Sequence, residues 1–289
     1  MMYNNVERLL AVTIKSTHLL NLALTSNTDI VSKRIAGETE LILSFTTYNK
    51  RVHDVHLVIE SIAEQTLKPN RLILWLDENE FTLETIPLIL HKQIERGLEV
   101  RFCPNYKSYK KLIPTLMQFP NANIITIDDD VLYPHDMIEI LYKENKLFPN
   151  CILSHMAHKI VLDLEGYPLP YLKWEIGTAE HKEGKLIVPI GVGGVFYPVG
   201  ALSHECLNNK KFTALAPHAD DIWFKAMSLL NDIKCKKVND ARDFSERFLI
   251  LQNNQDIGLM HENFFKGRND EQIKNVFEQY NIKSYLGFN

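Results

Sequence analysis

The stretch NANIITIDDDVLYPHD, residues 121–136, sets three adjacent aspartates, Asp128 to Asp130, directly after a short apolar run. A short isoleucine-rich run that ends in polar residues is typical of a strand buried in a parallel sheet. Three neighbouring carboxylates repel one another, so water or a cation must compensate them. Because side chains alternate along extended backbone, Asp128 and Asp130 can face one side while Asp129 faces the other. The triplet is therefore a candidate cation site, with a solvated turn before Pro134 as the alternative.

The flanking sequence repeats this strand pattern and alternates it with helical spacing. Strands that alternate with helices predict an α/β fold with a Rossmann-like, mainly parallel sheet flanked by helices. The chain from 40 to 265 contains no linker-like composition that would divide it. The predicted strands lie in 40–49, 68–80, 98–104, 121–130, 151–163 and 185–198, and the predicted helices in 52–66, 83–97, 109–119 (interrupted near Pro114), 218–232 and 271–282.

Composition narrows the class of protein. The 289 residues are 45% hydrophobic and 24% charged, which is ordinary for a globular domain with a sizeable core. A net charge of -4 and the lack of any Lys/Arg block argue against nucleic-acid binding. The four cysteines form no CxxC pair, and the sequence has neither a signal-peptide pattern nor a 20-residue apolar run. These features predict a cytoplasmic protein, with peripheral attachment to the inner face of the cell membrane left open.

Residues 1–37 are predicted to form a helical N-terminal extension. Val6, Leu9, Leu10, Ile14 and Leu20 recur near a 3.6-residue period, which predicts a helix that packs on the domain. A helix lying on a membrane surface is the alternative, although its polar face carries few Lys or Arg residues. The main domain then spans 38–289.

Polar side chains follow three of the predicted strands at the points where they end. These are Thr46 to Asn49 with Arg51, then Asp77, then the aspartate triplet. In open parallel sheets ligands collect beyond the carboxyl ends of the strands, so we expect the three clusters to converge. Arg51 is expected to be a surface charge. At most one of Lys110 and Lys111 is expected to face the site, and the other is expected to be solvated.

Five segments in this order resemble a known family. ILSFTTYNKR (42–51), RLILWLDE (71–78), YKKLIPTL (109–116), IITIDDDVLYP (124–134) and HADDIWFK (218–225) look like a metal-dependent GT-A glycosyltransferase. The resemblance covers about 40–265 and is nearest to bacterial enzymes of the glycosyltransferase family 2 type, which build surface polysaccharides. It implies a nucleotide-binding half, about 38–134, and an acceptor and catalytic half, about 135–289.

The resemblance also implies roles for matching residues. Asp130 would hold Mn²⁺ or Mg²⁺, Asp128 would share the metal or meet the donor, and Asp129 would meet ribose or sugar. The remaining donor contacts implied by the matching positions are Thr47, Tyr48, Asp77 and Lys111. Asp77 has a competing role, since it could cap a turn with Asn79.

The second half carries the candidate catalytic base. Asp220 and Asp221 precede an apolar-periodic helix, where one aspartate is a favoured N-cap. The resemblance implies that Asp221 is the general base and that Asp220 supports or caps. It also implies a late metal ligand, His261, and a basic loop over the diphosphate with Lys266 and Arg268. Among the remaining candidates, Gly191, Gly193 and Gly194 could allow close backbone approach or form a tight connection, and His155, His158, Trp174 and Trp223 could face the site or pack in the core.

The resulting hypothesis is an inverting, metal-dependent glycosyltransferase of the hexosyltransferase type. It would move sugar from a nucleotide-diphosphate donor, expected to be a UDP-sugar, to a hydroxyl of a saccharide or glycolipid acceptor. The alternatives are a metal-dependent phosphoryl or nucleotidyl transferase, a glycosidase, and a non-catalytic protein that binds nucleotide sugar. The sequence leaves the oligomeric state open.

Overall fold

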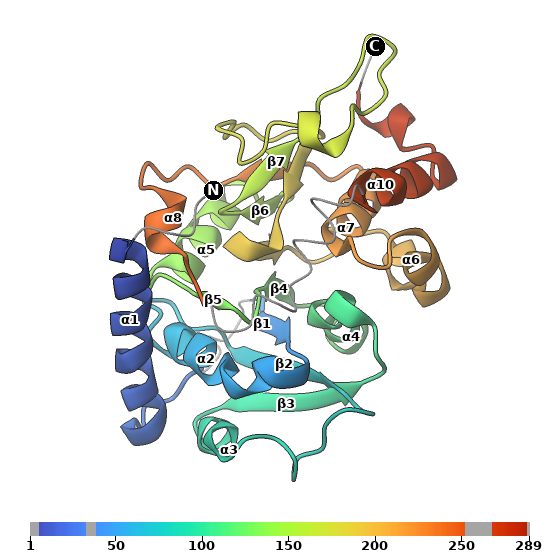
Figure 1. The fold of residues 1–289 in the computed structure, drawn as a ribbon. Helices are drawn as coiled ribbons and strands as arrows, with labels where there is room; N and C mark the ends of the chain where they lie inside the picture. The colour runs from blue at the N-terminus through green and yellow to red at the C-terminus, as the bar shows by residue number, and fades with distance from the viewer. Residues whose placement is uncertain (1–5, 33–38, 252–267, 288–289) are drawn as a thin grey trace.

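A computed structural model of the chain describes residues 6–32, 39–251 and 268–287. Its central sheet has seven strands in the order β10-β6-β9-β4-β1-β2-β3 (Figure 1). The strands are β1 (Leu41–Thr46), β2 (Arg71–Asp77), β3 (Leu98–Cys103), β4 (Asn123–Thr126), β6 (Ile152–Ser154), β9 (Val195–Tyr197) and β10 (Cys235–Lys237). Two small ribbons join β5 (Val131–Leu132) to β11 (Leu249–Ile250) and β7 (Ala157–Lys159) to β8 (Ile187–Pro189).

The sheet is mostly parallel. β1 pairs in parallel with β2 on one side and β4 on the other, so that Ile42 lies opposite Arg71 and Ile124. β3 extends this sheet beside β2, and β10 pairs in parallel with β6. Only β9 runs antiparallel, between β4 and β6. The predicted α/β class with a mainly parallel sheet flanked by helices is confirmed.

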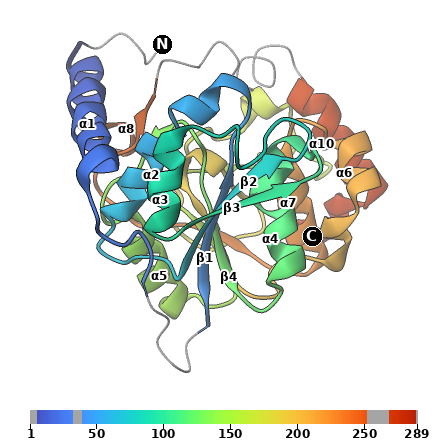
Figure 2. The same cartoon turned by 90° about the horizontal axis from the view of Figure 1, so that it is seen from below.

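Helices cover both faces of the sheet, as the view in Figure 2 shows. None of the described helices is both long and apolar enough to cross a bilayer. One face packs against α1 (Val6–Thr25), α2 (Val55–Ala63), α3 (Leu88–Glu95) and α5 (Met137–Leu147), and the other against α4 (Ile113–Gln118), α6 (Asn209–Leu215), α7 (Asp220–Leu230) and α10 (Arg268–Gln279), while α8 (Phe244–Arg247) lies near α1.

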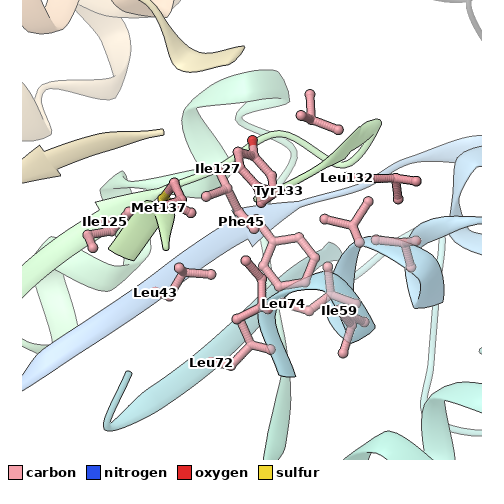
Figure 3. Packing of buried hydrophobic residues seen from close by; sticks show 14 of the residues in the cluster. Leu43, Phe45, Ile59, Leu72, Leu74, Ile125, Ile127, Leu132, Tyr133 and Met137 are labelled. Atoms are coloured by element: carbon pink, nitrogen blue, oxygen red, sulfur yellow. The ribbon is translucent and has the colours of Figure 1, made fainter. Parts of the chain in front are cut away.

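Apolar residues on alternate strand positions form the core beneath α2 and α5. Leu43, Phe45 and Leu74 lie in one cluster with Ile59 and Met137 (Figure 3). Each such side chain is fully buried, a contribution of roughly 1.5–3 kcal/mol apiece to folding. This packing fixes the carboxyl ends of β1, β2 and β4 relative to one another.

The segment predicted as an interrupted helix near Pro114 divides into two elements. Residues 107–111 form the 3₁₀ helix η2, and α4 begins immediately afterwards with Pro114 in its first turn. Proline is tolerated there because the first-turn N–H groups have no helical partner in any case. The interruption places Lys110 and Lys111 at the end of η2, against β1 and β2.

Helix α1 forms as predicted but docks by a different face. The expected contacts Val6, Leu9, Leu10, Ile14 and Leu20 are all exposed, between 41% and 78%. The buried positions are Val12, Leu19 and Ala23. Polar contacts complete the docking: Glu64 of the segment after α2 pairs with Lys15 and lies 2.7 Å from the His18 ring nitrogen. The expectation that the face with Val6, Leu10 and Ile14 packs on the domain was wrong, because the helix carries a second apolar face.

The β5–β11 ribbon ties a late segment of the chain to the aspartate triplet. β5 follows the triplet directly, and the N–H of Leu251, just after β11, donates to the carbonyl of Asp130 at 2.7 Å. An ion-pair group reinforces this connection: Asp136 and Asp240 each pair with both Arg242 and Arg247.

Candidate active site

The carboxyl ends of β1 and β4 bring Thr47 and the triplet together. The Thr47 hydroxyl donates to Asp129 Oδ2 at 2.6 Å, and Arg51 Nη1 donates to Asp129 Oδ1 at the same distance. Both oxygens of Asp129 are therefore engaged within the chain. Burial and the neighbouring Asp130 charge raise the pKa of Asp129 to about 6, although Arg51 and Thr47 oppose the rise. A donor contact by Asp129 would have to share these oxygens with Thr47 and Arg51.

Arg51 is buried, contrary to the expectation of a surface charge. The 3₁₀ helix η1 (Asn49–His53) turns the chain back over the strand ends, so that Arg51 also reaches Asp130 Oδ2 at 3.1 Å. Its guanidinium lies 5.4 Å from the centre of the half-buried Tyr48 ring. Burial opposes its charge, but Asp129 and Asp130 outweigh that effect and raise the Arg51 pKa. We call Thr47, Arg51, Asp129 and Asp130 the Arg51 cluster.

A second cation serves the other end of the triplet. Lys111 Nζ lies 3.1 Å from Asp128 Oδ1 and 3.0 Å from Asp220 Oδ2, so it joins the strand end to the start of α7. The lysine is buried, and although burial opposes its charge, Asp128, Asp220 and Asp221 raise its pKa well above the ordinary value. One lysine thus links a strand exit with a helix N-terminus far away in sequence.

Asp221 lies beside this lysine and is held by backbone. Its Oδ2 accepts a hydrogen bond from the Gly191 N–H at 3.3 Å. Burial, then repulsion from Asp220, raises the pKa of Asp221 to about 7, while Lys111 lowers it. Asp221 is therefore a carboxylate that can exchange a proton near neutral pH. The side chain of Asp220 is occupied by Lys111, which suits a supporting role.

Gly191 permits the close approach of these groups. A Cβ at this position would lie 2.7 Å from Lys111 Nζ and 3.2 Å from Asp128 Oδ1. Any side chain here would displace the lysine or the carboxylate, so the glycine is needed for packing against the site. Gly193 is similarly constrained, since its Cβ would meet the Met156 nitrogen at 2.5 Å. We call Lys111, Asp128, Asp220, Asp221 and Gly191 the Lys111 cluster.

The donor set fits a divalent cation with substrate oxygens in its shell. Among the described residues, Asp129 and Asp130 pair with Arg51, while Asp128 and Asp220 pair with Lys111. Carboxylate oxygens suit Mg²⁺ and Mn²⁺, which often take one or two protein carboxylates plus phosphates and water. Within residues 6–32, 39–251 and 268–287 no three His, Cys, Asp or Glu side chains converge on a metal-sized point. Asp128 and Asp130 would thus be ligands in a shell completed by substrate.

Other predicted residues lie near or away from these clusters. Asp77 is buried at the end of β2, and its Oδ1 accepts from the Asn79 N–H at 2.9 Å, the turn-capping alternative. Lys110 is buried as well, which contradicts the expectation that one of the adjacent lysines is solvated. Its pKa is lowered by burial, against the charge of Asp77. Arg268 is exposed at the first position of α10, while His261 and Lys266 lie outside the described residues.

The remaining aromatic and histidine candidates are core residues. Trp174 and Trp223 are buried and donate to the carbonyls of Leu169 and Cys206. His155 and His158 are buried too, and burial lowers the pKa of each to about 4. Neutral, packed imidazoles of this kind serve structure.

The fold and site define an α/β protein with an acidic, ligand-competent edge on a mostly parallel sheet. No protein-family model matches the chain, and a search of curated proteins finds no match. Among solved structures, the chain is similar to S. aureus TarS 1-349 in complex with UDP, with 13% identity, 86% of this chain and 69% of that chain covered, and a TM-score of 0.49. It is also similar to the mannosyltransferase PcManGT from Pyrobaculum calidifontis in complex with GDP-Man and Mn²⁺, with 13% identity, coverage of 97% and 78%, and a TM-score of 0.48. Likenesses this distant assign neither family nor activity.

Proposed function

We propose that the protein is an inverting glycosyltransferase of the GT-A type that transfers sugar from a nucleotide-diphosphate donor to a hydroxyl acceptor. The observation that carries the proposal is the position of Lys111 between Asp128 and Asp220. That contact holds the acidic strand end, a site for a charged donor, directly beside a carboxylate pair whose second member titrates near neutral pH. A donor site and a base are the two parts that a single displacement requires.

Asp221 supplies the base in this proposal. An acceptor hydroxyl is a weak nucleophile, so Asp221 accepts its proton as the oxygen forms a bond to the anomeric carbon of the donor. The bond from that carbon to the diphosphate breaks at the same time, and the nucleoside diphosphate leaves with the electron pair. Attack opposite the leaving group inverts the configuration. The Gly191 N–H fixes the carboxylate orientation, and the raised pKa of Asp221 makes it a stronger base than an exposed aspartate.

The leaving diphosphate needs positive charge. Asp130 and Asp128 would hold Mn²⁺ or Mg²⁺, with His261 as a further candidate ligand, and the bound cation would neutralise charge on the phosphate oxygens. The donor contacts in the proposal are Thr47, Tyr48, Asp77, Lys111, Asp128 and Asp129, together with Lys266 and Arg268 near the diphosphate. The donor nucleotide in the proposal is UDP.

The biological setting completes the proposal. The acceptor is a saccharide or glycolipid in surface polysaccharide synthesis. The reaction takes place in the cytoplasm, with peripheral contact to the inner membrane face as an option. These assignments rest on the five ordered motifs rather than on the geometry.

The test is to incubate purified protein with UDP-sugars and GDP-mannose, adding Mn²⁺, Mg²⁺ or a chelator. We expect one donor to raise the melting temperature in the presence of metal, and slow release of nucleoside diphosphate from that donor. Release of pyrophosphate or sugar phosphate instead would identify a nucleotidyl or phosphoryl transferase. The absence of donor binding and of donor hydrolysis across the whole panel would refute the proposal.

A further inference from the structure

The outward face of α1 carries an apolar stripe that nothing in the described chain covers. Val6, Leu10 and Leu24 are 78%, 57% and 52% exposed, and Leu9 and Ile14 flank them with similar exposure. In Figures 1 and 2 the helix lies at the periphery, with the other elements on one side of it. These exposed side chains follow one another along the helix, and a contiguous exposed apolar patch is unusual on a monomeric protein. Such a patch marks an interaction surface.

The spacing of the stripe is that of a two-helix seam. Its positions are separated alternately by four and three residues, the period that keeps side chains facing one partner helix. The central positions are threonines whose hydroxyls are already satisfied: Thr13 donates to the Leu9 carbonyl and Thr17 to the Thr13 carbonyl, each at 2.8 Å. Their outward surface can therefore be methyl rather than hydroxyl. We call these positions the α1 seam: Val6, Leu10, Thr13, Thr17, Leu20 and Leu24.

The seam is complementary to itself when reversed. An antiparallel copy centred on residue 15 places Val6 against the partner's Leu24, Leu10 against the partner's Leu20, and Thr13 against the partner's Thr17. Large residues meet at both ends and small ones at the centre, which lets the two backbones approach. A two-fold symmetric interface requires this kind of self-matching patch.

Charge distinguishes a second copy from a lipid surface. Helices that lie on membranes carry Lys and Arg on the flanks of the apolar face, where they meet anionic headgroups. The two such residues of α1 face the domain instead: Arg8 donates to the Phe248 carbonyl at 3.2 Å, and Lys15 pairs with Glu64. Glu7 and His18 border the seam on one edge, and none of the six seam positions carries a charged residue.

We propose that the α1 seam pairs with the same seam of a second copy, antiparallel, to form a symmetric dimer. The seam runs from Val6 to Leu24, nearly the whole 20-residue length of α1, so the contact would extend over about 30 Å of paired helix. The proposal does not depend on the proposed function. Pairing through α1 leaves the Arg51 and Lys111 clusters within each copy complete.

Light scattering coupled to size exclusion tests the mass of the full chain at high micromolar concentration. We expect twice the 33.5 kDa of one chain. Leu10→Glu should return the protein to a monomer, since it sets a charge in the seam, whereas the matched Leu164→Glu at a 98% exposed site elsewhere should not. Equal thermal melts of the two variants would show that folding is unaffected. A wild-type monomer, or a Leu10→Glu dimer, would overturn the proposal.

Cysteine cross-linking tests the orientation. The four native cysteines are buried, so added ones report on the seam. Val6→Cys with Leu24→Cys should cross-link two chains on oxidation, while Val6→Cys alone should not, because its partner copy would lie about 27 Å away along the helices. Cross-linking by Val6→Cys alone would indicate a parallel pair and reject the arrangement. Flotation of monomeric protein with vesicles of equal phosphatidylcholine and phosphatidylglycerol would assign the seam to lipid instead.

Discussion

In the Arg51 cluster a buried arginine meets Asp129 and Asp130 through direct ion pairs, and Thr47 satisfies the remaining oxygen of Asp129. In the Lys111 cluster, by contrast, a single lysine is shared by Asp128 and Asp220 with Asp221 beside it. The first arrangement sets one cation against two carboxylates. The second sets one cation against three, and burial raises the pKa of Asp128 and of Asp221.

This difference indicates what each end contributes. A saturated, buried ion pair is costly to break and holds the chain in one geometry. An undercompensated carboxylate group gains from binding a cation or a proton, which is the behaviour that catalysis and donor binding need. We therefore propose that Arg51 and Thr47 mainly hold the triplet in place, and that the Lys111 cluster mainly serves the chemistry.

The largest effect is expected from Asp221→Asn. Loss of the proton acceptor should lower the transfer rate by about 10³-fold, within the range of general-base contributions. Donor-induced thermal stabilisation should persist, because Asp220 and Asp128 still hold Lys111. The rate is measured as nucleoside diphosphate released in the presence of acceptor, with Asp232→Asn, an exposed carboxylate, as the control. A transfer rate close to that of the wild type in Asp221→Asn would show that Asp221 is not the general base.

The pH dependence of the same variant sharpens this prediction. The pKa of Asp221 is about 7 when folded and close to 3.8 when unfolded, so between these values the folded state binds more protons. The free energy of unfolding contributed by this group therefore falls as pH rises from 4 to 7. We expect Asp221→Asn to be more stable than wild type at pH 8 by about 1–2 kcal/mol, and the gain to vanish near pH 4. A gain independent of pH in urea titrations would contradict the raised pKa.

The next effect is expected from Arg51→Met. Removing the arginine leaves the buried Asp129 carboxylate without its partner, which should lower the free energy of unfolding by about 3–4 kcal/mol at pH 8. Arg242→Met is the matched control: its pairs with Asp136 and Asp240 involve a side chain that is 51% exposed, and its loss should cost about 1 kcal/mol or less. Chemical denaturation measures both. Equal losses would mean that the Arg51 cluster does not anchor the triplet.

The smallest effect is expected from Gly191→Ala. The added methyl would meet the flexible end of Lys111, so the fold should lose only about 1 kcal/mol. Displacing the lysine should nevertheless reduce transfer about tenfold, because the link between Asp128 and Asp220 weakens. Gly184→Ala, where a Cβ meets nothing nearer than 3.7 Å, is the control. If Gly191→Ala transfers sugar at the wild-type rate, the contact of Lys111 with Asp128 and Asp220 is not needed for activity.

The α/β class and the position of the triplet after a strand could be predicted because they depend on local pattern. Buried strands leave a short apolar run, and the polar residues after β1, β2 and β4 mark where each run ends. The convergence of Thr47 with Asp129 then follows from parallel pairing of β1 with β4. The ligand and donor roles of these residues stay predictions.

The ion pairs of the buried arginine and lysines could not be predicted in the same way. Arg51 lies 78 residues from Asp129, and only the turn of η1 over the sheet brings them together. One signal in the sequence could have predicted this ion pair. Arg51 follows the end of one strand by a few residues, and the aspartates follow the end of the strand that pairs with it. Lys110 and Lys111 are buried against different neighbours, Lys110 near Asp77 and Lys111 between Asp128 and Asp220, and spacing alone does not reveal that η2 is enclosed on both sides. Helix α1 has two apolar faces, and sequence does not say which one docks.

The hydrogen bond from Leu251 to Asp130 has a consequence for hybrid enzymes. Exchanging the acceptor-side portion of this chain for that of another protein would sever the β5–β11 ribbon unless the donated piece restores it. Chimeras joined just after residue 134 would thus lose the support that β11 gives to the aspartate triplet, whereas grafts that retain residues 240–251 with their native sheet would keep it. The boundary for such engineering follows three-dimensional pairing, not the order of the two halves along the chain.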